Sequence, residues 1–82
     1  MGIKKLAAKV ADYKDRLDRG KASKIKPDHV AHVLEKLRKK EAALKLELAA
    51  AKNSDSKNRL TRKISVAQEQ INRAEWLLSK IA

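Results

Sequence analysis

The chain has 82 residues and a formal charge of +11, from 21 Lys and Arg against 10 Asp and Glu. It contains no Cys and no Phe, two Gly and one Pro, which excludes disulfide-framed, collagen-like and Gly/Pro-rich proteins. A chain of this length holds one small domain, residues 1–82, and the richness in Ala, Lys and Leu is typical of a long-helix protein.

Residues 3–19 are predicted to form the first helix. Apolar side chains recur there at steps of three and four residues, which is the spacing of an amphipathic stripe. They are Ile3, Leu6, Val10, Tyr13 and Leu17. Gly20 stands where a C′ glycine ends a helix, and residues 20–26 follow as a basic linker without periodicity.

Residues 27–52 and 57–81 are predicted to form two longer helices, joined by a polar turn at 53–56. Pro27 has the fixed backbone angle of a first helical turn. Both helices carry sustained heptads. The first series is Val30, Leu34, Leu37, Glu41, Leu44, Leu48 and Ala51, and the second is Leu60, Ile64, Ala67, Ile71, Ala74, Leu78 and Ile81. Folding the chain about Ser54 pairs each large residue of one series with a residue of the other, which predicts an antiparallel helical hairpin.

Two apolar residues, Val33 and Leu77, lie beside this seam near the open end of the hairpin. The seven-residue linker lets the first helix reach them, so we expect it to dock there. The predicted fold is therefore all-α, an antiparallel hairpin with a shorter N-terminal helix in a three-helix arrangement, with a dimer as a further expectation.

Nothing in the sequence predicts catalysis, a cofactor or a metal site. The glycines are isolated, so no phosphate-binding loop is present, and no nucleophile has a paired base. Asp28, His29 and His32 are spaced like metal ligands but lack a fourth donor, and both His fall outside the heptad seam. No apolar run is as long as a membrane span, and we expect a non-enzymatic, cytoplasmic protein.

The excess of positive charge is the main functional signal, because it attracts polyanions through counterion release. It gathers in the linker and around the predicted hairpin tip. The sequence therefore predicts phosphate-backbone binding to RNA or DNA with low sequence specificity. The candidate residues are Lys21, Lys24, Lys26, Lys45, Lys52, Lys57, Arg59, Arg62 and Lys63. A basic surface that serves only solubility is the alternative interpretation.

A second hypothesis is a protein-interaction or assembly module. The outer face of residues 41–51 is apolar and thin, which suits a homodimer, although strong helix propensity alone also explains it. Its residues are Ala42, Ala43, Leu46, Ala49 and Ala50. Trp76 is a candidate anchor for a base or an acidic protein surface, unless the first helix or another subunit covers it. Binding of the Lys-rich first helix to an anionic membrane surface is a third hypothesis.

Overall fold

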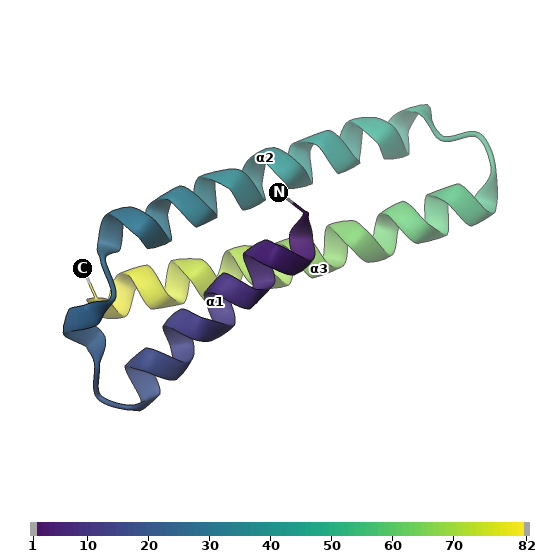
Figure 1. Cartoon of the computed structure of the whole chain (residues 1–82). Coiled ribbons are helices and arrows are strands. Elements are labelled where there is room, and N and C mark those ends of the chain that lie inside the picture. Colours follow the sequence, from purple (N-terminus) through teal and green to yellow (C-terminus); the bar gives the residue numbers. More distant parts are fainter. Residues whose placement is uncertain (1, 82) are drawn as a thin grey trace.

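Three helices make up the described part of the chain, residues 2–81 of a computed structural model (Figure 1). They are α1 (Ile3–Asp18), α2 (Pro27–Ala50) and α3 (Ser54–Ile81), with a short 3-10 helix, η1 (Ala22–Lys24), between α1 and α2. α2 and α3 pack side by side as an antiparallel hairpin, and α1 packs against both. Residues 2–81 contain no strand. The predicted all-α hairpin with a docked N-terminal helix is therefore confirmed.

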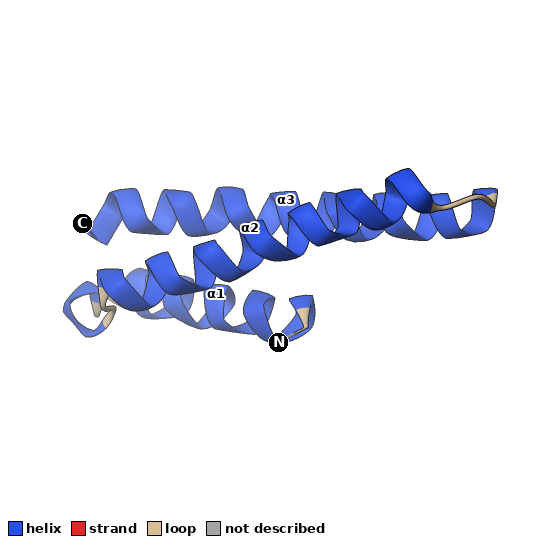
Figure 2. Ribbon diagram, turned by 90° about the horizontal axis from the view of Figure 1, so that it is seen from above, coloured by secondary structure: helices blue, strands red, loops and turns tan. Residues whose placement is uncertain are grey.

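The molecule is a rod with principal dimensions of 47 × 19 × 18 Å. The linker between α1 and α2 lies at one end, and the turn between α2 and α3, which we call the tip, lies at the other (Figure 1). Figure 2 shows that α1 lies beside the half of the hairpin nearer the linker and stops well short of the tip. The hairpin thus has a three-helix half and a two-helix half.

A glycine closes the C-terminal end of α1. Gly20 has a φ of 74°, in the left-handed region. Its N–H donates to the Leu17 carbonyl at 3.0 Å, and the N–H of Lys21 donates to the Arg16 carbonyl at 2.8 Å. These two bonds form a Schellman motif, which satisfies carbonyls at the helix end and turns the chain into the linker. Gly20 holds the C′ position that the sequence indicated, and α1 ends at Asp18, one residue before the predicted boundary.

The third helix begins three residues earlier than predicted. The Oδ1 atom of Asn53 accepts a hydrogen bond from the backbone N–H of Ser56 at 2.8 Å, which is the bond of an N-cap. Asp55 adds negative charge in the first turn, where the helix dipole favours it. The connection therefore shortens from the predicted 53–56 to residues 51–53, and α2 ends at Ala50 rather than at residue 52.

The core lies in the three-helix half, where the stripe of α1 meets the hairpin. Leu6 and Val10 of α1 are buried there, and Val33 and Leu77 are 3% and 1% exposed. The expectation that α1 covers these two off-seam residues is confirmed. The full cluster of buried residues is Leu6, Val10, Ile25, Val30, Val33, Leu34, Leu37, Ile71, Ala74 and Leu77.

The heptad seam continues into the two-helix half with less burial. Leu44 and Ile64 are buried, whereas Leu48 and Leu60, which are nearer the tip, are only half-buried. The single charged seam residue, Glu41, is half-buried and forms an ion pair with Lys45 at 3.6 Å. The burial of the seam residues thus decreases from the linker end towards the tip, because α1 does not extend over the seam near the tip.

Candidate nucleic-acid interface

Six of the nine predicted phosphate-binding residues surround the tip. We call these six the tip cluster: Lys45, Lys52, Lys57, Arg59, Arg62 and Lys63. The early start of α3 places four of them in its first three turns, where Leu60 and Ile64 take the positions that face α2. The basic side chains occupy the remaining faces of the helix, and all six are exposed.

Most of the tip cluster is not neutralised by neighbouring acids. Lys45 pairs with Glu41, but no described residue forms an ion pair with any of the other five cations. Glu47 and Asp55 are the acidic residues in the stretch from 45 to 63, which carries six basic ones. Five exposed cations at one end of the rod therefore keep their full charge for an external anion.

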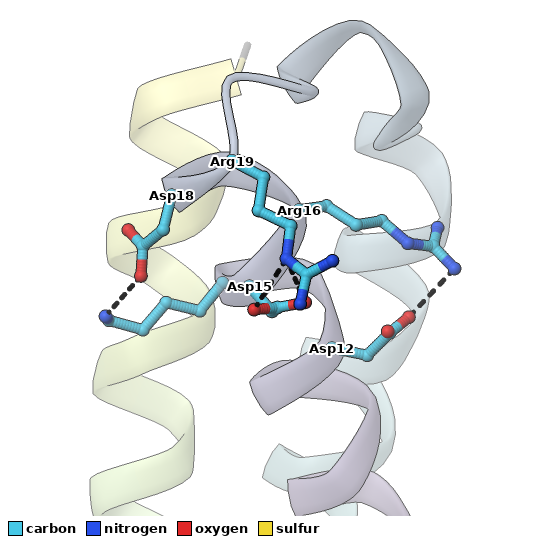
Figure 3. Close-up of polar contacts among 6 residues, drawn as sticks. Asp12, Asp15, Arg16, Asp18 and Arg19 are labelled. Carbon is cyan, nitrogen blue, oxygen red and sulfur yellow. Dashed lines mark hydrogen bonds and ion pairs between the residues drawn. The ribbon is translucent and has the colours of Figure 1, made fainter.

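Most acidic residues of the chain form ion pairs outside the tip. Seven of the ten form ion pairs, and three of those seven lie on α1. There, Asp12 pairs with Arg16 and Asp15 with Arg19, at 2.8 and 3.2 Å (Figure 3). Each pair joins residues four positions apart on an exposed helix face. The charge of α1 is thus partly balanced by its own residues, and the tip is left with the uncompensated excess.

The linker residues Lys21, Lys24 and Lys26, which we call the linker cluster, lie at the other end of the rod from the tip (Figure 1). The structure therefore does not bring the two predicted basic clusters together. The linker, for which the sequence predicted no regular element, contains local structure. It contains the 3-10 helix η1, and Ile25 is 3% exposed within the core, so it fixes the linker on the hairpin.

A hollow beside the start of α1 brings further cations to the tip cluster. Lys4 of α1 and Lys40 of α2 line it together with Arg62 and Lys63 of α3. Sequence reasoning did not place Lys4 and Lys40 in the tip cluster, because Lys4 belongs to α1 and reaches Lys40, Arg62 and Lys63 only when α1 docks on the hairpin. The positive surface at the tip therefore extends to the N-terminal end of α1.

The thin apolar face predicted on α2 is exposed along its length. We call Ala42, Ala43, Leu46, Ala49 and Ala50 the back face; all five are exposed, and the side chain of Leu46 is 75% exposed. This face belongs mostly to the two-helix half of the rod. Ala43 lies nearest to α1 and lines a shallow hollow with Leu6 of that helix.

Trp76 is partly covered by its neighbours. It is 44% exposed and lines a second hollow with Val10 and Lys14 of α1 and Arg73 of α3. The Nζ atom of Lys80 lies 5.7 Å from the centroid of the indole ring, a cation–π distance. The indole therefore sits at the edge of the α1–α3 interface, with one face directed towards a cation of its own helix.

The remaining sequence hypotheses concern metals and membranes. Residues 2–81 hold no group of three or more His, Asp or Glu side chains arranged to bind a metal ion. No helix in this part of the chain combines the length and apolarity needed to cross a bilayer. The apolar stripe proposed for membrane binding is in the core, with Leu6 1% and Val10 2% exposed. A lipid surface would reach this stripe only if α1 left the hairpin.

Comparisons of the chain with protein-family models, with curated proteins and with solved structures each gave no match.

Proposed function

We propose that this protein binds RNA or DNA through phosphate contacts, with the tip cluster as the main contact surface. The observation that carries the proposal is the set of five exposed cations at the tip that have no ion-pair partner among the described residues. Such cations release condensed counterions when they contact phosphates, and this release supplies the free energy of non-specific binding.

The shape of the tip favours contacts to the backbone over contacts to base edges. A narrow pair of helices projects the cations outward, and the two aromatic residues of the chain, Tyr13 and Trp76, lie outside the tip. The tip therefore offers no platform on which bases can stack. Low sequence specificity follows, because phosphate contacts carry no direct information about sequence.

The test is the salt dependence of binding to a duplex and to a single-stranded oligonucleotide. If about five phosphates are contacted, the slope of log K against log salt concentration is about −4 to −5. In the variant in which Lys57, Arg59, Arg62 and Lys63 are all replaced by Gln, each lost contact flattens the slope by about 1. Affinity that does not change between low and physiological salt would contradict the proposal.

A matched control variant distinguishes the contribution of the tip cluster from the contribution of the protein's net charge. Replacing Lys14, Arg16, Arg19 and Lys39 by Gln removes the same four charges, but from cations that already have carboxylate partners. We expect this variant to keep most of the slope and affinity. Equal losses in both variants would show that net charge, rather than the tip, governs binding.

The exposed back face supports a second candidate function, assembly through a second copy of the chain. Leu46 is 75% exposed, and burying such an apolar side chain against another surface would stabilise the complex. Light scattering at high salt, where repulsion between the basic chains is screened, tests this candidate. A dimer that Leu46→Glu converts to a monomer supports it, and a monomer at all concentrations contradicts it.

A further inference from the structure

The groove between α2 and α3 is only partly filled by α1. At a rise of about 1.5 Å per residue, the 16 residues of α1 span about 24 Å, while the 28 residues of α3 span about 42 Å. α1 starts part-way along the hairpin and runs away from the tip (Figures 1 and 2). The same groove therefore continues past the start of α1 with no helix in it.

This open stretch is a hollow of about 540 Å³, which we call the end groove. Its apolar residues are Leu44, Val66 and Ile3, of which Leu44 is buried and Val66 is 43% exposed. Its charged residues are Lys4, Lys40, Arg62, Lys63 and Glu47. An apolar floor with four cations and one acid around it differs from the rest of the tip, which is basic without such a floor.

We infer that the end groove binds an acidic amphipathic helix of a partner protein, placed end to end with α1. A helix is the shape that the groove already accepts, because α1 occupies its other half. A partner helix with apolar residues at i, i+3, i+4 and i+7 would cover the floor formed by Leu44 and Val66. Asp and Glu on the flanks of that stripe would face Lys40 of α2 and Arg62 and Lys63 of α3, with Lys4 at the start of α1 where the two helices meet.

Two other occupants fit the end groove less well. A second copy of this chain is strongly basic, and three of its acids, Asp12, Asp15 and Asp18, already pair with cations of α1. Two copies would therefore bring like charges together at this groove. A nucleic-acid backbone would satisfy the cations but would leave the exposed Val66 uncovered, because phosphates make no use of an apolar floor.

The test uses a fluorescently labelled synthetic peptide of about 15 residues, a length at which an isolated helix becomes marginally stable. Its Leu residues form one helical stripe, and Glu residues flank the stripe. A scrambled peptide of the same composition is the control, because it keeps the charge and loses the stripe. At physiological salt, we expect anisotropy to show saturable binding of the amphipathic peptide and at least about tenfold weaker binding of the scrambled one.

Protein variants separate the end groove from the tip surface. Val66→Ser, at a half-exposed site, and the double change Lys4→Glu with Lys40→Glu should each weaken peptide binding several-fold or more, with an unchanged helical circular dichroism spectrum. Lys57→Glu with Arg59→Glu reverses two tip charges that do not line the end groove, so it should weaken binding to nucleic acid more than binding to the peptide.

Three results would overturn the inference. Equal binding of the two peptides would show general attraction to negative charge, and affinity unaffected by Val66→Ser and by Lys4→Glu with Lys40→Glu would place the peptide elsewhere. A dimer that Val66→Asp dissociates would identify a second copy as the occupant. Nucleic-acid binding is measured separately with an oligonucleotide. A failure of peptide binding therefore does not contradict the proposed nucleic-acid binding, and the reverse also holds.

Discussion

Arg38 of α2 and Glu75 of α3 form an ion pair across the hairpin, with Nη2 3.2 Å from Oε1. Six other ion pairs in the described part of the chain join residues four positions apart on one helix. The Arg38–Glu75 pair therefore differs from these six in linking two elements that are distant in sequence. The side chains of Arg38 and Glu75 are 59% and 50% exposed, so water screens the attraction between them.

Removing this pair should change stability only slightly. We expect Glu75→Gln to lower the free energy of unfolding by less than about 1 kcal/mol, because exposed ion pairs contribute about 0–1 kcal/mol. The loss should shrink further in about 1 M salt, where the Debye length is about 3 Å. Urea unfolding at low and high salt measures both effects. A loss that is large and independent of salt would mean that the hairpin depends on this pair.

Truncation of Leu37 should destabilise the fold strongly. Leu37 is 0% exposed within the core, and Leu→Ala changes at such sites cost about 2–5 kcal/mol through lost burial and the cavity left behind. Leu46→Ala on the same helix is the control, with an expected change within about 0.5 kcal/mol because Leu46 is 75% exposed. A cost at Leu46 that grows with protein concentration would instead indicate that a second copy covers the back face.

The N-cap of α3 should contribute measurably to stability. Asn53→Ala removes the acceptor of the Ser56 N–H, and the expected loss is about 1 kcal/mol. Asn58→Ala, an exposed site inside α3, should be neutral or slightly stabilising because Ala is the better helix former. Thermal unfolding followed by circular dichroism compares the two. Equal behaviour of the two variants would show that the cap does not determine where α3 begins.

A buried glutamine offers a stabilising substitution. Gln70 is 7% exposed, and its Oε1 atom accepts no hydrogen bond from any described residue. A buried acceptor without a partner costs about 1–3 kcal/mol, so Gln70→Met, which keeps a similar length, should raise the free energy of unfolding by about 1 kcal/mol. Gln68→Met on the exposed side of α3 should change it little. A loss of stability in Gln70→Met would contradict this reasoning.

The heptad spacing predicted the hairpin because a long helix that buries one face requires apolar residues at regular three- and four-residue steps. The same reasoning, applied to Val33 and Leu77, predicted where α1 docks. Ile25 was not recognised as a core residue, since one apolar residue in a basic linker has no periodicity. The only available signal was that Ile25 is the sole large apolar residue between Leu17 and Val30.

The tip cluster could be selected from sequence because its residues lie within one short stretch of chain. The end groove could not, because Lys4, Lys40 and Val66 come from three helices and share a surface only after α1 docks. The start of α3 was misplaced for a local reason. A helix that begins at 57 would have Ser56 as its N-cap, and Asn53 and Ser56 are both good N-cap residues; the structure selects Asn53, whose Oδ1 accepts the hydrogen bond from the Ser56 N–H.

The length of the rod has a consequence for how its two basic ends behave. In physiological salt, electrostatic attraction decays over about 8 Å, which is much shorter than the 47 Å long dimension of the rod, and the linker and the tip lie at its opposite ends. The two clusters therefore act as independent ends. If both ends bind phosphates, one molecule contacts two phosphate segments at once, on one nucleic acid or on two, with an avidity set by the distance between those segments.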